Sequence, residues 1–302
     1  MTNNYPKAQK NVYSVPFLAD ELGEFVLWYF TGSKCNLECS HCYVESGPKA
    51  NKHPDLSYKT FKKRLYEALA TEYEKLEIYF TGGEPFMNPD IYQMLEEALK
   101  HGNSTILTNA TLITKNRAKY LQEIQKRSNY DLSFRVSLEG PDKDSNNAIR
   151  GEKSFNKART GLSNLVRVGF NPIVTIMRNW PESNLDEVLT QFNLMLESVG
   201  IPDDKQRLKI LPPLHIGRET SRSGPYTDKN LFTDNCFSNY DYKNLQCCKC
   251  RTVSENGVWV CPILINEDEA QMGNTLLESA HDFPMRYMVC RTCRMEGMDC
   301  TN

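Results

Sequence analysis

Between residue 25 and about residue 215, short β-rich runs alternate with longer amphipathic stretches, and this alternation constrains the fold more than any other feature. Each unit of one strand and one helix takes roughly 30 to 40 residues, which is typical of βα units. Strands are expected at residues 25–30, 76–80, 104–108, 132–138, 171–177 and 207–211. Helices are expected at residues 58–73, 89–101, 115–128, 155–168 and 184–199. Capping residues precede these helices at Ser57, Asn88, Thr114, Ser154 and Ser183.

This order predicts an α/β protein with a parallel sheet, either an open doubly wound sheet or a barrel. In both folds the chemistry collects at the carboxyl ends of the strands, and every polar motif discussed below follows an expected strand. After the last strand the sequence becomes rich in Ser, Gly, Asp and Asn, and then rich in cysteine. We expect an N-terminal extension at 1–24, a core at 25–215, a linker at 216–235 and a cysteine-rich domain at 236–302.

The bulk composition excludes several classes of partner. The chain has 302 residues, 40% of them hydrophobic, which is enough for a full core. Its formal net charge of -2 argues against a nucleic-acid or anionic membrane surface as the main partner. The N-terminus MTNNYPKAQK lacks the apolar core of a signal peptide, and no apolar run is long enough to cross a membrane. A cytoplasmic location is therefore expected.

The 11 cysteines fall into two groups, three of them close together near the N-terminus and the others after residue 235. Cytosolic thiols are kept reduced, so a metal or redox role is favoured over a disulfide framework. We therefore expect two separate cysteine sites.

Cys35, Cys39 and Cys42 form a C-x3-C-x2-C pattern in the loop after the first expected strand. Thiolates at this density suit a soft metal or an iron-sulfur cluster. Three protein ligands leave one iron of a four-iron cluster open, where a second molecule can bind. The alternative is a zinc site completed by His41 or His53, although His41 is poorly placed inside the triplet to be a fourth ligand.

This spacing after a first strand, with His41 just before the last cysteine, resembles the signature of the radical S-adenosylmethionine (SAM) superfamily. The resemblance implies a partial (β/α)6 barrel of the TIM type and a catalytic [4Fe-4S] cluster bound by Cys35, Cys39 and Cys42. It also implies that SAM binds the open iron, with His41 near the adenine. Reductive cleavage would then give a 5′-deoxyadenosyl radical that abstracts hydrogen from a substrate carbon.

Two further strand ends resemble motifs of the same family. Gly82, Gly83 and Glu84 resemble the GGEP motif that binds the SAM ammonium, and carbonyls with a carboxylate are the acceptors that an ammonium needs. Asn109 lies in a segment similar to the family's TN-small sequence, which would place it near the site. An ordinary turn is the alternative for the glycine pair and for Asn109.

The segment VSLEGPDKDSNNAIRG resembles the family's VSLDGP and RG stretch, with Glu139 in place of the commoner aspartate. Ser137 and Glu139 are two residues apart in an extended strand, so they share a face and would reach the ribose or carboxylate of SAM. Arg150 has the planar fork that suits the SAM carboxylate, and a solvated loop charge is its alternative. Gly217 and Arg218 resemble a GR segment that follows a later strand in related enzymes.

The tail contains Asn256-Gly257, a strong two-residue hairpin signal. Pairing outward from this turn sets Thr252 against Cys261. Cys250 then becomes a diagonal neighbour of Cys261 on the same face, so one metal site could use both thiols.

Cysteines on both sides of this hairpin, the Gly273-Asn274 pair and a terminal C-x2-C resemble the SPASM/twitch extensions of radical SAM enzymes. Such extensions hold one or two auxiliary [4Fe-4S] clusters, and a structural zinc ribbon is the alternative. We expect at least one auxiliary cluster, with the ligands Cys250, Cys261, Cys290 and Cys293 and with Cys247, Cys248 and Cys300 as substitutes.

The resemblance implies an enzyme, and we favour a peptide or protein maturase because SPASM-like proteins often act on polypeptides. The alternative is a small-molecule dehydrogenase or epimerase, in which Cys236 would return a hydrogen atom to the substrate. A third hypothesis is a metal-binding protein without catalysis. The expected partners are a peptide, protein or small-molecule substrate and an electron donor such as flavodoxin or ferredoxin.

Overall fold

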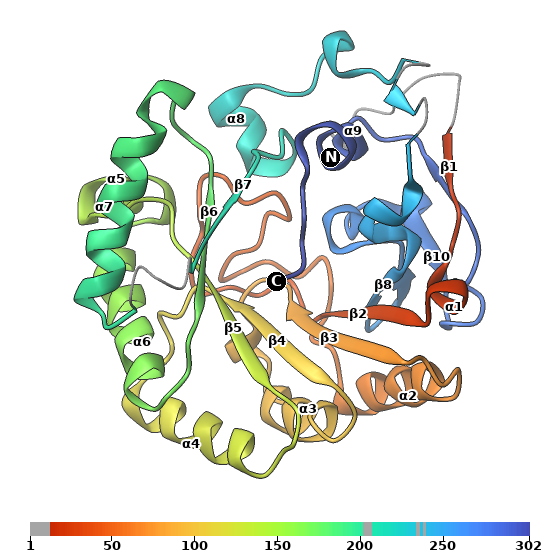
Figure 1. Ribbon diagram of the computed structural model, residues 1–302, viewed down its shortest axis with the longest axis horizontal. Helices are drawn as coiled ribbons and strands as arrows, with labels where there is room; N and C mark the ends of the chain where they lie inside the picture. The colour runs from red at the N-terminus through yellow and green to blue at the C-terminus, as the bar shows by residue number, and fades with distance from the viewer. Residues whose placement is uncertain (1–12, 202–206, 234–235, 238–239) are drawn as a thin grey trace.

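The protein is described by a computed structural model at residues 13–201, 207–233, 236–237 and 240–302. A nine-stranded sheet in the order β10-β9-β8-β2-β3-β4-β5-β6-β7 forms its centre. The parallel part consists of β2 (Glu24–Phe30), β3 (Lys75–Thr81), β4 (Asn103–Thr108), β5 (Leu132–Ser137), β6 (Ile173–Met177) and β7 (Leu208–Leu211). Figure 1 shows the sheet curving with helices on its outer side. The predicted parallel α/β fold is therefore confirmed.

The five expected helices are present as α2 (Tyr58–Leu69), α3 (Ile91–Ala98), α4 (Lys115–Lys126), α6 (Ser154–Arg167) and α7 (Leu185–Ser198). Two predicted caps are confirmed, because Ser57 accepts a hydrogen bond from the Thr60 amide and Thr114 accepts one from the Arg117 amide. Three short helices are also present, α1 (Ala19–Leu22), α8 (Thr220–Ser223) and α9 (Val289–Glu296).

Three other predicted caps are wrong. Asn88 follows a 3-10 turn, and its side-chain amide donates to the carbonyls of Thr31 and Leu56 instead of capping α3. Ser154 is the first residue of α6, and Asn184 rather than Ser183 precedes α7. The partners of Asn88 are distant in the sequence, and α6 and α7 each begin one residue away from the expected position. Local capping rules reveal neither effect.

Helix α5 (Lys143–Arg150) lies in a segment for which no helix was predicted. The Asp142 side chain caps it by accepting hydrogen bonds from the amides of Asp144 and Ser145. Its last residues are buried, so tertiary packing stabilises a helix whose polar sequence does not predict one.

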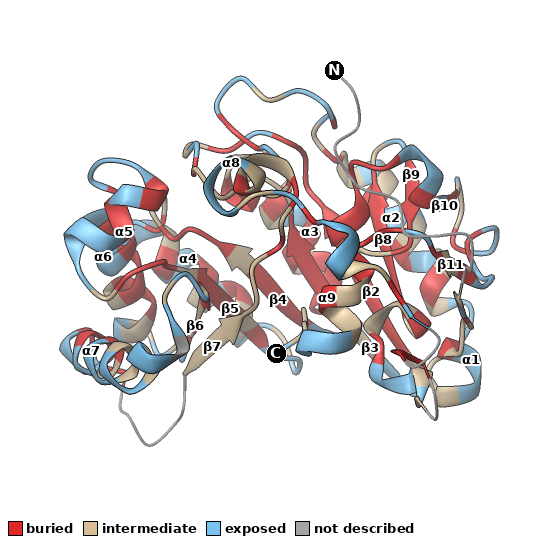
Figure 2. Ribbon diagram, turned by 90° about the horizontal axis from the view of Figure 1, so that it is seen from above, coloured by how far each residue is buried: buried red, intermediate tan, exposed pale blue. Residues whose placement is uncertain are grey.

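The core lies on both faces of the parallel strands. Alternate residues of β2 point to opposite faces, so Leu27 and Tyr29 pack toward the helices while Trp28 faces the barrel interior. There the Trp28 ring stacks on the Tyr79 ring at a centroid distance of 4.5 Å. Figure 2 shows β2 and β4 largely buried and β7 of intermediate exposure, with exposed residues on the outer helix surfaces.

The tail extends this sheet. β8 (Cys250–Ser254) pairs in parallel with β2, and β9 (Gly257–Trp259) and β10 (Gln271–Gly273) follow as antiparallel neighbours. A separate pair joins β1 (Tyr13–Val15) to β11 (Phe283–Met285) near the N-terminus, which Figure 1 shows beside the tail. The boundaries that we expected at residues 24, 215 and 235 stay predictions. Within the described residues, no helix is long and apolar enough to cross a membrane.

The predicted register of the tail hairpin is wrong by two residues. Thr252 pairs with Trp259 rather than Cys261, and Ser254 pairs with Gly257. Gly257 therefore already belongs to the ladder, where it has a φ of +145° and a Cβ would lie 2.2 Å from the Gln271 side chain. Extending the observed register by two residues sets Cys250 directly opposite Cys261, which keeps the two thiols adjacent.

Candidate active site

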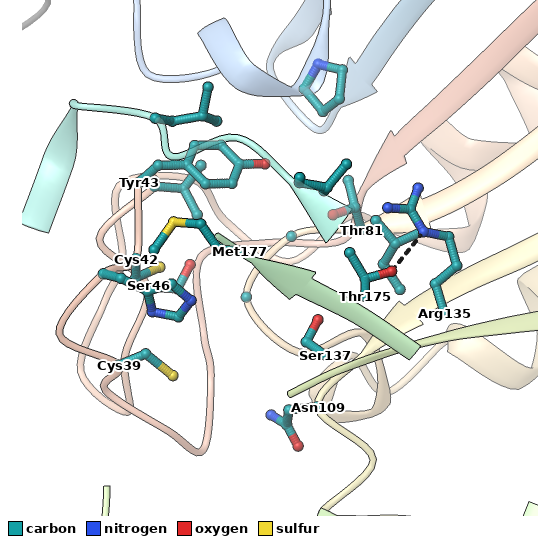
Figure 3. A pocket seen from close by; sticks show the side chains of 18 of the residues that line it. Cys39, Cys42, Tyr43, Ser46, Thr81, Asn109, Arg135, Ser137, Thr175 and Met177 are labelled. Carbon is teal, nitrogen blue, oxygen red and sulfur yellow. Dashed lines mark hydrogen bonds between the residues drawn. The ribbon is translucent and has the colours of Figure 1, made fainter. Parts of the chain in front are cut away.

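The loop that follows β2 carries Cys35, Cys39 and Cys42, and all three line one cavity at the carboxyl ends of the strands. Cys35 and Cys39 are buried, and burial raises the pKa of Cys35 to about 12 and raises the pKa of Cys39 as well. Figure 3 shows Cys39 and Cys42 on the same side of this pocket. The predicted triplet therefore presents its thiols together.

Arg218 holds this loop in place. Its Nε donates to the Cys39 carbonyl at 2.8 Å, its Nη2 donates to the Ser46 carbonyl, and its backbone amide donates to the Cys42 carbonyl at 3.1 Å. Gly217 has a φ of +57°, and a Cβ on it would lie 2.3 Å from the Tyr43 carbonyl oxygen. The GR pair thus supports the loop from outside the cavity lining.

The glycine pair after β3 packs against the other end of the loop. The Gly83 amide donates to the Gly32 carbonyl at 2.9 Å, and a Cβ on Gly83 would lie 2.0 Å from the Lys34 carbonyl oxygen. Gly82 and Gly83 also line the cavity. A side chain on Gly83 would prevent this close contact with the cysteine loop. Without side chains, Gly82 and Gly83 also leave their backbone atoms accessible from the cavity.

The Glu84 carboxylate is buried among internal donors. It accepts hydrogen bonds from the Phe86 amide at 3.2 Å, the Thr108 hydroxyl at 2.7 Å and the Asn109 amide at 2.8 Å. Burial raises its pKa. Glu84 is not among the described residues that line the cavity. In this structure its side chain joins the end of β3 to the end of β4. Its predicted contact with the SAM ammonium stays a prediction.

Asn109 lines the cavity and contacts the cysteine loop. Its Nδ2 donates to Asn36 Oδ1 at 3.0 Å and lies 3.8 Å from the Cys35 sulfur. Its Oδ1 accepts from the Thr111 amide at 2.9 Å, so it also forms the turn that was the alternative. Asn109 therefore lies beside the first thiol.

Glu139 joins two predicted residues. Its carboxylate accepts from His41 Nε2 at 2.9 Å, from Arg150 Nη2 at 2.6 Å and from the Met177 amide at 3.0 Å. Burial alone would raise the Glu139 pKa, but His41 and Arg150 outweigh it and lower the pKa to about 2. Together with Ser137, all of these residues line the cavity, and Arg150 is buried rather than solvated.

Four residues of the lining carry buried polar atoms without a hydrogen-bond partner among the described residues. Buried polar groups are normally paired, so these atoms indicate a ligand with several polar groups. The carboxylate, ribose and adenine of SAM supply such groups, and the three thiols supply the ligands of an iron-sulfur cluster. The four atoms are Trp28 Nε1, His41 Nδ1, Ser46 Oγ and Arg150 Nε.

The tail completes the cavity. Pro262, Ile263, Met298 and Cys300 line it together with the core residues. The Tyr43 pKa is raised by burial and further by the thiols of Cys300 and Cys42, so this ring lies between the two cysteine groups. Sequence reasoning missed these tail contributions because they depend on how the tail packs against the barrel.

The tail thiols gather around Cys261. Burial raises the pKa of Cys261 to about 11, and the Cys261 thiol in turn adds to the raised pKa of five other cysteines. These five are Cys247, Cys250, Cys290, Cys293 and Cys300. The four favoured ligands are therefore neighbours, and so are two of the substitutes. Cys248 instead donates to the Lys243 carbonyl at 3.8 Å.

Across the described residues, no three His, Cys, Asp or Glu side chains are arranged to hold a single metal ion. The thiols of a [4Fe-4S] cluster each bind a different iron, so they stand farther apart than the ligands of one ion.

Cys236 is not among the described residues that line the cavity. Burial raises its pKa, but hydrogen bonds from Thr233 and the charges of Arg291 and Arg294 lower it overall. Its predicted role as hydrogen donor has no support from this placement, whereas the Cys300 thiol does line the cavity.

A partial parallel barrel with three clustered thiols and unpartnered polar atoms at its carboxyl end defines an iron-sulfur enzyme with a second ligand beside its cluster. Residues 29–194 match the Radical SAM superfamily, which is more than half of the 302-residue chain. The chain belongs to the radical SAM superfamily. Members of this family are enzymes that use a [4Fe-4S] cluster and SAM, and the site described above has the residues that fit both.

Two curated relatives share part of the chain. The Fe-coproporphyrin III synthase of Methanosarcina barkeri is 33% identical over 180 residues, which cover 59% of this chain and 42% of that protein. The mycofactocin maturase MftC of Mycobacterium tuberculosis is 31% identical over 164 residues, which cover 52% of this chain and 38% of that protein. The chain thus spans less than half of the length of either relative.

Among solved structures, Streptococcus suis SuiB bound to the precursor peptide SuiA has a similar fold, with a TM-score of 0.63 and 17% identity. The similarity covers 87% of this chain and 65% of SuiB. It extends beyond the barrel into the tail, which agrees with the predicted SPASM/twitch-like extension.

Proposed function

We propose that this enzyme modifies a peptide or protein by radical chemistry. The observation that carries the proposal is the cavity between two cysteine groups, lined by Cys35, Cys39 and Cys42 on one side and by Cys300 on the other. When bound, the cluster and SAM supply a 5′-deoxyadenosyl radical that removes a hydrogen atom from a substrate carbon. Cys35, Cys39 and Cys42 would hold this cluster.

The chain's own residues orient the ligands and exclude water. The Glu139 carboxylate fixes His41 and Arg150 through hydrogen bonds of 2.9 and 2.6 Å, which leaves His41 Nδ1 and Arg150 Nε for a bound ligand. Apolar side chains from core and tail surround the remaining space, which protects a reactive radical from solvent. They include Leu107, Met177, Leu214, Ile263 and Met298.

The peptide substrate is supported by two of the similar proteins. One is named a maturase, and the other has been solved with a precursor peptide. Because the chain matches only part of each, we carry over the substrate class and not the particular modification.

A small-molecule substrate is the second candidate, for a dehydrogenase or an epimerase. It is favoured by the tail residues that close the cavity and by the partial identity to a Fe-coproporphyrin III synthase. A purely structural metal protein is not retained, because the family consists of enzymes.

We also infer at least one auxiliary [4Fe-4S] cluster in the tail, an electron donor such as flavodoxin or ferredoxin, and a cytoplasmic location. The location is supported by the cysteines, since all of them are free thiols in the structure. The auxiliary cluster is supported by the thiols around Cys261.

The test begins with anaerobic reconstitution of the wild-type protein and of Cys39→Ala, followed by dithionite and SAM. Wild type is expected to form 5′-deoxyadenosine and Cys39→Ala is not. Peptide and metabolite mass spectra of cells that express either protein then identify the substrate class. A mass change confined to one peptide supports the maturase, a change confined to a metabolite supports the second candidate, and no SAM cleavage by the reconstituted wild type contradicts both.

A further inference from the structure

Arg135 is a charged side chain inside the barrel. It lies in β5 next to Phe134, whose ring packs in the core beneath the helices, so Arg135 points to the opposite face and lines the cavity. It precedes Ser137 by two residues, which places it about 7 Å deeper along the strand. Only 2% of its surface is exposed. Figure 3 shows it across the pocket from the labelled Cys39.

The guanidinium of Arg135 has neutral partners. Its Nε donates to the Thr175 hydroxyl at 3.2 Å, and its Nη1 donates to the carbonyls of Cys300 and Thr301. Among the described residues, the hydrogen-bond acceptors of Arg135 are this hydroxyl and these two carbonyl oxygens. None of them belongs to a carboxylate, and Nη2 donates no hydrogen bond to any of them. An arginine fork has five donors, and two of its three nitrogens are used here.

The charge around Arg135 is not balanced. Lys209 lies nearby and shares the Thr301 carbonyl with it, while the Lys209 ammonium pairs with the Asp299 carboxylate at 3.1 Å. Two cations therefore face one carboxylate. Buried charges are normally paired, so this end of the cavity favours an anion.

The cavity lining is mostly apolar, with the hydroxyls of Thr81 and Thr175 near Arg135 (Figure 3). A ligand that fills the cavity needs an apolar body, with its negative charge at the position that Arg135 reaches. A carboxylate matches the planar fork of a guanidinium by two parallel hydrogen bonds. The apolar lining of the cavity includes Leu107, Leu211, Pro212, Leu214, Ile263 and Met298.

We propose that Arg135 binds the carboxylate of an apolar substrate at the end of the cavity opposite the cysteine loop. This inference rests on the proposed function, because it assigns the substrate of the same site. The carboxylate could belong to the C-terminal residue of a peptide or to a small organic acid. Arg135 would then determine specificity, while the cysteine loop and the Glu139 group serve the cofactors.

The test uses two matched pairs of probes with the reconstituted protein and SAM under anaerobic conditions. One pair is 4-phenylbutyrate and 4-phenylbutyramide, and the other is a hexapeptide ending in leucine as the free acid and as the C-terminal amide. Isothermal titration calorimetry gives Kd for each probe with wild type, Arg135→Gln and Arg135→Lys. Arg127→Gln serves as the control, because Arg127 forms an exposed ion pair with Glu96.

Wild type and Arg127→Gln should bind the acid of at least one pair about tenfold more tightly than its amide. Arg135→Gln should bring this ratio close to one, and Arg135→Lys should keep part of it. The pair that shows the preference identifies the source of the carboxylate. The ratio compares two probes on one sample, so a partly unfolded variant does not distort it.

Two outcomes would overturn the proposal: no preference for either acid in wild type, or an unchanged ratio in Arg135→Gln. A purely structural Arg135 gives the second outcome, with both probes weakened equally. Formation of 5′-deoxyadenosine in the same samples is measured separately. Its absence would contradict the proposed function, while the acid-to-amide ratio would still report on Arg135.

Discussion

The Nε of Arg218 donates to the carbonyl oxygen of Cys39 over 2.8 Å, although the two residues are separated by 179 positions in the sequence. Arg218 also contacts the Ser46 and Cys42 carbonyls. A side chain that follows β7 thus fixes the conformation of a loop that follows β2. The shape of the thiol triplet therefore depends on a distant residue.

Arg218→Gln should lower the iron content after reconstitution and destabilise the apoprotein by about 2 kcal/mol, because hydrogen bonds from a charged donor are lost. Iron and sulfide assays and urea denaturation measure both effects. Arg127→Gln is the matched control for removal of an arginine. Full iron content in Arg218→Gln would show that the loop keeps its shape without this support.

Gly83→Ala should destabilise the protein by about 3 kcal/mol, since the new methyl group would lie 2.0 Å from the Lys34 carbonyl oxygen. Gly47→Ala, in the cysteine loop, is the control, because its nearest new contact is an ordinary 3.4 Å to the Glu38 side chain. Urea denaturation of the two variants gives the comparison. Equal stabilities would contradict the close packing of the glycine pair.

Glu84→Gln should reduce the stability of the apoprotein by about 2 kcal/mol, because the amide group cannot accept from all three donors of the carboxylate. Denaturation without SAM and a SAM titration separate two roles. Unchanged apoprotein stability with weaker SAM binding would favour the ammonium contact that the sequence motif predicts. Lower stability in the absence of SAM supports the internal role.

Acid should destabilise the apoprotein partly through Glu139. Its pKa is lowered to about 2 in the folded state, so its contribution to stability is present above the ordinary carboxyl pKa and is lost as the pH falls toward 2. Between about pH 5 and pH 2, Glu139→Gln should therefore lose less stability than wild type. Denaturation curves across this range test the difference, and parallel pH profiles would contradict it.

Cys261→Ala should lower the iron content by about four atoms per chain, because its thiol lies among five others in the tail. Cys248→Ala is the matched control, since the Cys248 thiol donates to the Lys243 carbonyl instead. Iron analysis of both reconstituted variants makes the comparison. Equal iron contents would remove Cys261 from the proposed auxiliary ligands.

Periodic patterns and local spacing predicted the barrel strands, the main helices and the cysteine triplet, because these depend on neighbouring residues. Ser57 and Thr114 cap their helices as expected, since a cap needs only the next turn. The motifs after β3, β4 and β5 also meet at one cavity, as parallel strands require. Glu84 is the exception, because its donors belong to the chain itself.

What the sequence did not reveal depends on contacts between distant segments. In the observed hairpin Ser254 pairs with Gly257, so Gly257 lies in the strand ladder, which the Asn-Gly motif alone does not reveal. Arg135 is the one charged residue of β5, and this charge within a strand was the available signal for its place in the cavity. Cys300 reaches the cavity through tail packing that no local spacing encodes.

The parallel pairing of β2 with β8 also bears on how the chain folds. β2 is made early, yet the Val26 to Tyr29 segment pairs with residues from Cys250 to Val253, which are made far later. Until β8 arrives, one edge of a strongly apolar strand has unpaired backbone groups, and such edges promote aggregation. A fragment that ends before β8 should therefore aggregate during synthesis even though it contains every strand from β2 to β7.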